Sequence, residues 1–356
     1  MPINKQYYSW NMFIRQLRPT ERKTRIRNFT WLIVGIYQCR SVHLSKIAEK
    51  IPGTATLPSI TRRLSRFLKN PSIRVREWYE PIARNIIQRL SDRAIRLIVD
   101  GSKVGFGNQL LIVAIAYRKR TIPLAWTWIK SNRGHSTSYK QKALLSYVHG
   151  LIPPKTGVIL LGDAEFGAVE VQKLLNKWRW EYVLRQKGCY LVKKQDKDNF
   201  QRLDSIVDKP RQSVWLTACK LTAKYAYSVN LLAHWEAGEK DPWLLATNLP
   251  SQKEALKAYK CRMWIEEMFG DLKGNGFDLE STHLRDFLRL SRLTLAVVML
   301  YVWLVTFGAR VIKAGKRRFV DRSDRRDHSI FRIGRNMVER CLTNGVNLRI
   351  SLIPCR

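Results

Sequence analysis

Four polar side chains that suit phosphate and metal binding recur at helical spacing within residues 259–273. They are a phenol, a guanidinium, a carboxylate and an ammonium: Tyr259, Arg262, Glu266 and Lys273. At about 100° per residue, these four would share a helix face about 60° wide. A carboxylate is a ligand for Mg²⁺, and the other three groups bind phosphate oxygens. The pattern favours a metal-bound carboxylate held against a nucleic-acid backbone, although a solvated helix face would tolerate the same residue types.

Two acidic residues stand side by side in this segment, and composition does not choose between them. Helix geometry does, because Glu267 lies about 100° around the helix from Glu266 and outside the shared face. We therefore expect Glu266 to be the functional acid. Glu267 should face solvent or a partner subunit.

Two aspartates follow apolar runs upstream. Asp100 follows Leu97-Ile-Val99, and Asp163 follows Val158-Ile-Leu-Leu161 and a glycine. A carboxylate that closes an apolar strand is costly unless it meets a cation, and two neighbouring carboxylates repel unless a metal lies between them. Either aspartate alone reads as a turn or cap residue, but both together with Glu266 predict a metal site. Glu165 is a lower-ranked alternative ligand beside Asp163.

The elements expected around these acids alternate between strands and helices. Three strands, a helix, a strand, a helix and a strand are expected at 96–103, 109–117, 121–130, 138–151, 156–163, 168–178 and 182–185. This is the order of a ribonuclease H-like core, a mixed five-stranded sheet with flanking helices. In that fold the first and fourth strands are parallel neighbours, so Asp100 and Asp163 would lie side by side.

The first 90 residues are basic and read as helical. They carry 18 Lys and Arg residues but four Asp and Glu residues. After a short helix at 45–51, a second helix at 60–69 is expected, with Ser59 as its cap. Its apolar residues are Ile60, Leu64, Phe67 and Leu68, and its other faces carry Arg62, Arg63 and Arg66. We expect DNA contact here, through either a helix-turn-helix or an ordinary bundle with a basic face.

The remaining segments complete a four-part plan. Strands are expected at 213–222, 226–235 and 243–247, inside a β-rich insertion at 189–250. The plan is a helical DNA-binding domain at 1–90, a catalytic core at 91–188 and 251–312, the insertion, and a basic C-terminal region at 313–356. That last region could bind DNA or form a solvated arm.

The composition points to a polyanionic partner in a reducing compartment. The 356 residues carry a net charge of +36, which favours nucleic acid. Six cysteines are scattered without a C-x-x-C pair, and no apolar signal segment opens the chain. The most apolar run, 293–307, is shorter than the roughly 18–20 residues that cross a bilayer. We expect a cytoplasmic, nucleoid-associated protein with no membrane segment, and a buried helix at 293–307.

The spacing Y-x2-R-x3-E-x6-K, with two aspartates upstream, resembles the signature of IS4-type (Tn5-like) DDE transposases over roughly residues 58–340. The resemblance implies cut-and-paste transposition of an insertion sequence in bacteria. It implies that Asp100, Asp163 and Glu266 hold two Mg²⁺ ions, for which Mn²⁺ can substitute. Phosphates near the cleaved end would be gripped by Tyr259, Arg262 and Lys273.

The resemblance also implies partners. These are double-stranded DNA, both as terminal inverted repeats and as target, and a second protomer. A tryptophan would stack on a flipped base, and the candidates are Trp235, Trp243 and Trp264. The chain departs from the family in the run Ala164-Glu165-Phe166 after the second acid, because family members often have an arginine before the aromatic residue, where this chain has Glu165.

Two other functional classes stay open. One is a different ribonuclease H-like nuclease, such as a junction resolvase. The basic N-terminal region and the long insertion argue against it. The other is a catalytically retired transposase that regulates by binding DNA, which the presence of all three acids disfavours.

Overall fold

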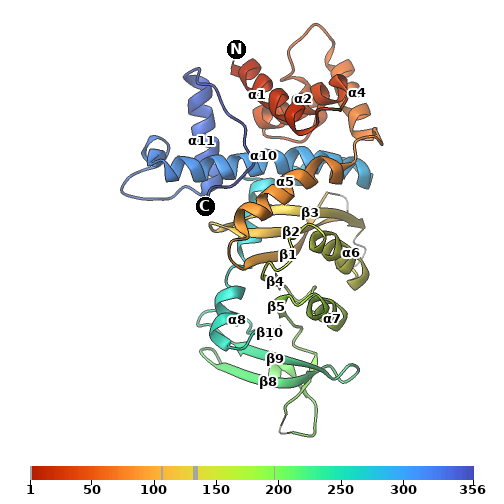
Figure 1. The fold of residues 1–356 in the computed structure, drawn as a ribbon, viewed down its shortest axis with the longest axis vertical. Coiled ribbons are helices and arrows are strands. Elements are labelled where there is room, and N and C mark those ends of the chain that lie inside the picture. The colour runs from red at the N-terminus through yellow and green to blue at the C-terminus, as the bar shows by residue number, and fades with distance from the viewer. Residues whose placement is uncertain (1, 106, 131–134, 196) are drawn as a thin grey trace.

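A mixed sheet of ten strands runs through the protein (Figure 1), in the order β3-β2-β1-β4-β5-β10-β9-β8-β6-β7. The computed structural model describes residues 2–105, 107–130, 135–195 and 197–356. Within the predicted core, the strands are close to the expected ranges: β1 (Ile95–Val104), β2 (Asn108–Tyr117), β3 (Arg120–Lys130), β4 (Val158–Gly162) and β5 (Glu181–Arg185). Helices α6 (Ser138–His149) and α7 (Val169–Lys177) connect β3 to β4 and β4 to β5.

Strands β1 and β4 are parallel neighbours, which confirms the predicted adjacency. Their register pairs Ile95 with Val158 at one end and Val99 with Gly162 at the other. Gly162 allows a tight approach, because a Cβ added there would lie 3.2 Å from the Val99 side chain and 2.9 Å from Phe166. The carboxyl-terminal end of β4 therefore lies beside Val99 of β1, directly before Asp100.

The β-rich segment continues this sheet and does not form a separate layer. Its strands are β6 (Leu191–Lys193), β7 (Gln201–Arg202), β8 (Ser213–Leu221), β9 (Tyr227–His234) and β10 (Trp243–Thr247). Strand β10 pairs antiparallel with β5, so the edge of the core sheet is covered by the segment. A short 3-10 turn, Leu203–Ser205, lies between β7 and β8.

The N-terminal region is helical, as predicted, and comprises α1 (Pro2–Leu17), α2 (Lys23–Cys39), α3 (Leu44–Ala48), α4 (Leu57–Lys69) and α5 (Val75–Leu90). The predicted apolar face of α4 is confirmed, because Ile60, Leu64, Phe67 and Leu68 are buried. The predicted cap is wrong: Thr56, not Ser59, caps α4 by accepting a bond from the Ser59 amide. Residues 49–56 separate α3 from α4, which is longer than the 3–4-residue turn of a helix-turn-helix.

A long helix, α10 (Phe287–Lys313), lies between the first four N-terminal helices and the sheet (Figure 1). It has 27 residues, so it extends well beyond the predicted 293–307 run. By length and composition alone it could cross a membrane, but 83% of its most apolar window is buried inside the protein. The guanidinium of Arg292 on α10 donates to the carbonyls of Leu68 and Ile73, which joins α10 to the end of α4.

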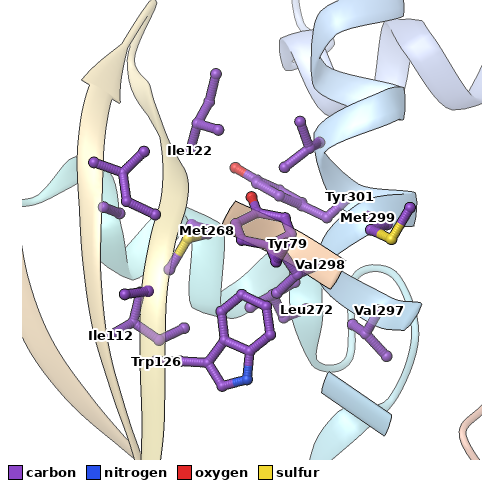
Figure 2. Close-up of a cluster of buried hydrophobic side chains, with 14 of the residues drawn as sticks. Tyr79, Ile112, Ile122, Trp126, Met268, Leu272, Val297, Val298, Met299 and Tyr301 are labelled. Carbon is purple, nitrogen blue, oxygen red and sulfur yellow. The ribbon is translucent and has the colours of Figure 1, made fainter. Parts of the chain in front are cut away.

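One part of the core is closed by α5, α9 and α10 against the sheet (Figure 2). Tyr301 of α10 donates to the carbonyl of Thr121 at 2.9 Å, and Tyr79 of α5 donates to that of Pro123 at 2.6 Å. Both buried phenols therefore satisfy their hydroxyl groups on β3. The apolar side chains between them in the same view include Ile112, Ile122, Trp126, Met268, Leu272, Val297, Val298 and Met299.

The segment expected to be one helix at 259–273 is two helices, α8 (Gln252–Tyr259) and α9 (Trp264–Leu272). Residues 260–263 form turns between them, with bonds such as that from the Arg262 amide to the Tyr259 carbonyl. These three-residue spacings wind the chain more tightly than an α-helix. The prediction that residues 259–273 form a single helix with one shared polar face is therefore wrong. Lys273 lies outside α9, as its C-cap.

The C-terminal region is packed against α10. It is therefore not a solvated arm, which was one of the two alternatives expected from the sequence. A 3-10 turn, Lys316–Phe319, leads to α11 (Ile330–Thr343), which crosses α10 (Figure 1). The two helices cross so closely at Gly334 that a Cβ there would lie 1.9 Å from the Leu304 carbonyl oxygen. The final segment is anchored by the Ser351 carbonyl, which accepts from Thr306 and Arg310. A further 3-10 turn, Leu279–Ser281, precedes α10.

Candidate active site

The two aspartates meet where β4 ends beside β1. Asp163 follows the last residue of β4, but Asp100 lies inside β1, which runs on to Val104 and pairs Asp100 with Ile112. The expectation that Asp100 closes its strand is therefore wrong, because β2 continues beside β1 after β4 has ended. Asp100 is only 8% exposed, and its Oδ1 accepts from the Gly101 amide.

The electrostatics of the two carboxyls show a site that disfavours negative charge without a cation. Burial raises the pKa of Asp100 to about 7; Arg262 opposes this effect and the nearby Asp163 carboxylate adds to it. Burial also raises the pKa of Asp163, while the Glu165 amide and Arg262 act in the opposite direction. A buried acid that feels the charge of a partly buried one is an arrangement that a divalent cation stabilises.

Arg262 bridges the strand acid and the helix acid. Its Nη1 donates to Asp100 Oδ2 at 3.0 Å, and its Nη2 donates to Glu266 Oε1. The guanidinium is largely buried, whereas the Glu266 side chain is 49% exposed. The structure therefore brings Asp100, Arg262 and Glu266 together, and the Arg262–Glu266 contact is the one that helical spacing predicts.

Tyr259 joins this group, and Lys273 makes a different contact. Burial raises the pKa of Tyr259 to about 12, and the charges that act on it include Arg262, Asp163 and Asp100. Lys273 instead pairs with Glu280 at 3.4 Å. Among the described residues, the one ion pair of Lys273 is with this acid beyond α9.

Glu267 faces away from the aspartates, on the side of α9 that meets β3. Its carboxylate lies 3.0 Å from Arg120 Nη2, and the same arginine donates to Asp271 at 2.8 Å. The Glu267 side chain is 57% exposed. The two glutamates therefore lie on different sides of α9. Glu267 is exposed, as expected, but it also contacts an arginine of its own chain.

The three candidate tryptophans occupy different surroundings, and all are partly buried. Trp243 packs edge-on against Tyr259 with ring centroids 5.2 Å apart. Trp235 donates its indole N–H to the Glu239 carbonyl in the turn after β9. Trp264 packs on the main core at the start of α9. Of the three, Trp243 has a ring contact with a candidate site residue.

The chemistry of the residues present, rather than their arrangement, fits a divalent cation. In the part of the chain that the structure describes, no group of three or more His, Cys, Asp or Glu side chains is arranged to hold a metal ion. The Arg262 guanidinium lies between two of the acids, where it supplies positive charge. Buried carboxylates whose pKa is raised, already paired with a cation, are a donor set suited to Mg²⁺ or Mn²⁺.

Helix α4 lies on the far side of α10 from the sheet (Figure 1) and carries several basic residues. Arg62 and Arg66 are exposed. Arg63 is half-buried, and its pKa is lowered first by burial and then by Arg27 of α2. An arginine held beside another arginine is a site where an added anion would be favourable.

Sequence reasoning missed the side chains that surround Glu165. Its carboxylate accepts from the amide and hydroxyl of Ser136 and from Nε2 of Gln109. Gln141 donates to the Glu165 carbonyl at 3.0 Å. No motif in the sequence marks these residues, because serine and glutamine at these spacings are common and their partners lie far along the chain.

Comparison with known families identifies the family of the chain. The sequence matches the family model described as "Transposase DDE domain" over residues 106–303. The chain belongs to this transposase DDE family. The matched range contains Asp163 and Glu266 and begins after Asp100.

The structure is also similar to piggyBac transposase in its cryo-EM synaptic complex with hairpin DNA. The two share 11% sequence identity, with 99% of this chain and 83% of that chain covered and a TM-score of 0.47. No curated protein matches the sequence.

Proposed function

We propose that the chain is an IS4-type DNA transposase that excises and integrates an insertion sequence by metal-dependent strand cleavage and strand transfer. The observation that carries the proposal is the meeting of Asp100 and Asp163 on adjacent parallel strands, with Glu266 attached through Arg262. Membership of the DDE transposase family supports it. The strand order β3-β2-β1-β4-β5 supports a ribonuclease H-like core beneath the site.

The proposal assigns a role to each part of the chain. Residues 1–90 bind DNA, residues 91–188 and 251–312 form the catalytic core, residues 189–250 are an insertion, and residues 313–356 form a basic C-terminal region. The packed α10–α11 crossing supports a C-terminal region that stiffens the core.

Asp100, Asp163 and Glu266 would hold two Mg²⁺ ions, and Mn²⁺ would substitute. When bound, such ions activate the attacking oxygen and stabilise the leaving oxygen in phosphoryl transfer. Arg262 can then exchange its carboxylate partners for a phosphate, to which a guanidinium binds in a bidentate manner. Tyr259 keeps its proton at neutral pH, because burial raises its pKa to about 12, so its hydroxyl can donate to a phosphate oxygen. Lys273 would add a phosphate contact after exchanging Glu280.

The partners of the proposed enzyme are terminal inverted repeats and target DNA, bound by two protomers. The net charge of +36 supports a polyanionic partner, and the exposed arginines of α4 support end binding through Arg62, Arg63 and Arg66. The homodimer rests on the family resemblance. A cytoplasmic location associated with the nucleoid accords with a DNA substrate.

The experiment is a cleavage assay with Mg²⁺ on the inverted repeats that flank the gene, with a four-way junction in parallel. Cleavage at the repeat ends, dependent on both ends and on metal, is the expected result. Preferential cutting of the junction would instead favour the resolvase reading. Binding of the repeats without cleavage in Mg²⁺ or Mn²⁺ would favour a retired transposase.

A further inference from the structure

Glu165 lies two residues after Asp163 and carries a second carboxylate near the acids, so its contacts determine what it can do. Its side chain is only 8% exposed. Oε1 accepts from the Ser136 amide at 2.6 Å and from the Ser136 hydroxyl. Oε2 accepts from Gln109 Nε2 at 3.3 Å and lies 3.6 Å from His135 Nδ1. The carboxylate of Glu165 therefore bonds to Ser136 and Gln109, whereas those of Asp100 and Glu266 bond to Arg262 of the candidate site.

The same residue holds Asp163 through its backbone. The Glu165 amide donates to Asp163 Oδ1 at 2.9 Å. The Glu165 carbonyl accepts from Gln141 Nε2, and this amide group also donates to the Ser136 hydroxyl at 2.9 Å. Residue 165 is thus fixed on its side-chain and main-chain sides at once, which fixes the amide that orients Asp163.

The network also reaches the strand that carries Asp100. Gln109 lies on β2, and its side chain crosses directly over Gly101, where an added Cβ would lie 2.2 Å from Gln109 Nε2. Gln109 is buried, and it connects the residue after Asp100 to Glu165. Gln109 therefore links the hydrogen bonds around Glu165, beside Asp163, to a close packing contact at Gly101, beside Asp100.

A carboxylate at position 165 has an electrostatic cost. Glu165 acts on Asp163 as a like charge and disfavours its ionised form. An amide side chain of the same shape would avoid that repulsion. It would lose one acceptor and place an NH₂ group against the Gln109 or Ser136 donors. The geometric benefit of an acceptor-only group explains why an acid is compatible with this position.

We propose that Glu165 is a positioning residue: it orients Asp163, and through Gln109 the Asp100–Gly101 segment, for binding of the divalent cations. The proposal rests on the proposed function. It assigns to Glu165 a role in metal affinity and not in the chemistry of the reacting phosphate. Partners of this kind typically change metal affinity by about 10–100-fold when they are removed.

The test measures Mn²⁺ binding to the DNA-free, full-length protein by calorimetry, and DNA-end cleavage across a Mn²⁺ titration. For Glu165→Gln we expect Mn²⁺ affinity to fall about 10–100-fold. We also expect cleavage that returns to within a few-fold of the wild-type rate once Mn²⁺ is saturating. Asp163→Asn should stay inactive at every Mn²⁺ concentration. Glu170→Gln, which alters an acid on α7 that accepts from Tyr225, is the matched control and should bind Mn²⁺ as the wild type does.

A second variant protects the test from misfolding. Ser136→Ala removes a hydroxyl donor to Glu165 and keeps the acid, so it should weaken Mn²⁺ binding in the same direction by a smaller factor. Wild-type Mn²⁺ affinity in both variants would overturn the proposal. So would a Glu165→Gln protein that stays inactive at saturating Mn²⁺, because that result would make Glu165 a ligand. Failure of the wild type to cut any DNA end would instead refute the proposed function, and the calorimetry would still report on Glu165.

Discussion

The guanidinium of Arg262 lies 3.0 Å from the carboxylate of Asp100, although 162 residues separate the two in the sequence. The same guanidinium holds Glu266, so one cation joins a strand of the sheet to the helix that follows the insertion. This contact gives the site its positive charge in the protein without DNA.

Replacing Arg262 with lysine keeps the charge and removes the planar fork. An ammonium does not reproduce a bidentate contact with two carboxylates or with a phosphate. We expect Arg262→Lys to slow DNA-end cleavage by roughly tenfold or more, with end binding largely retained. Single-turnover cleavage and gel-shift assays on the same DNA measure the two effects. A lysine variant that cleaves at the wild-type rate would show that only charge matters at this position.

Asp100→Asn and Asp163→Asn should each abolish metal-dependent cleavage. Each substitution removes a proposed metal ligand from a pair of neighbouring acids, and activity should fall by several orders of magnitude. DNA-end binding should be unchanged, because α4 lies on the far side of α10 from the sheet. Cleavage near the wild-type rate by either variant would contradict the site assignment.

Glu266→Gln and Glu267→Gln form a matched pair of neighbouring substitutions. Glu266 shares Arg262 with Asp100, so its loss should remove cleavage. Glu267 pairs with Arg120 on the other side of α9 and is largely exposed, so its loss should cost at most about 1 kcal/mol of stability and keep most activity. Cleavage rates and urea unfolding of both variants provide the comparison. The reverse pattern would remove the roles proposed for Tyr259 and Arg262 as well.

The raised pKa of Asp100 predicts a pH-dependent stability in the metal-free protein. Its folded pKa of about 7 exceeds the ordinary aspartate pKa of 3.8, so protonation favours the folded state. The resulting stability is complete below about pH 4 and is lost as pH rises through about 7, at roughly 1.4 kcal/mol per pKa unit. Urea unfolding of wild type and Asp100→Asn from pH 4 to 8 measures this. The asparagine variant should gain stability relative to wild type as pH rises, and parallel curves would refute the prediction.

Neutralising the exposed arginines of α4 should weaken DNA-end binding and its salt dependence. Arg62→Gln and Arg66→Gln each remove one potential phosphate contact, which lowers the slope of log affinity against log salt by about one unit. Lys155→Gln, an exposed residue in the turn before β4, is the control. Unchanged affinity and slope across a salt series would place end recognition elsewhere.

Much of the fold could be predicted from the sequence because its local signals agree with its packing. The continuous apolar runs before Asp100 and Asp163 predict buried central strands, and their parallel pairing follows from the order of elements. The apolar spacing in α4 likewise predicts the buried face that is observed. The continuous runs reflect strands buried on both faces of the sheet, and the spaced pattern of α4 reflects a helix buried on one face.

The break at residues 260–263 could not be predicted, because no glycine or proline marks it. Tertiary contacts determine it: Tyr259 packs on Trp243, while Arg262 reaches Asp100 on β1. The Lys273–Glu280 pair and the hydrogen bonds of Glu165 were also invisible, since both depend on how distant segments meet. A helical wheel gives the direction of a side chain but not its partner.

Helix α10 fixes the distance between the basic helix α4 and the sheet that carries the candidate site. Arg292 fixes it to the end of the basic helix α4, and Tyr301, two and a half turns further on, fixes it to strand β3 of the catalytic sheet. These two residues are about 14 Å apart along one continuous helix, with no hinge between them. If α4 holds the terminal repeat as proposed, the distance from the bound sequence to the scissile phosphate is a property of the protein. If base pairs are inserted between that sequence and the transposon end, the cut should stay at the same distance from the bound sequence. Relative to the transposon end, the cut would then shift by the number of inserted base pairs.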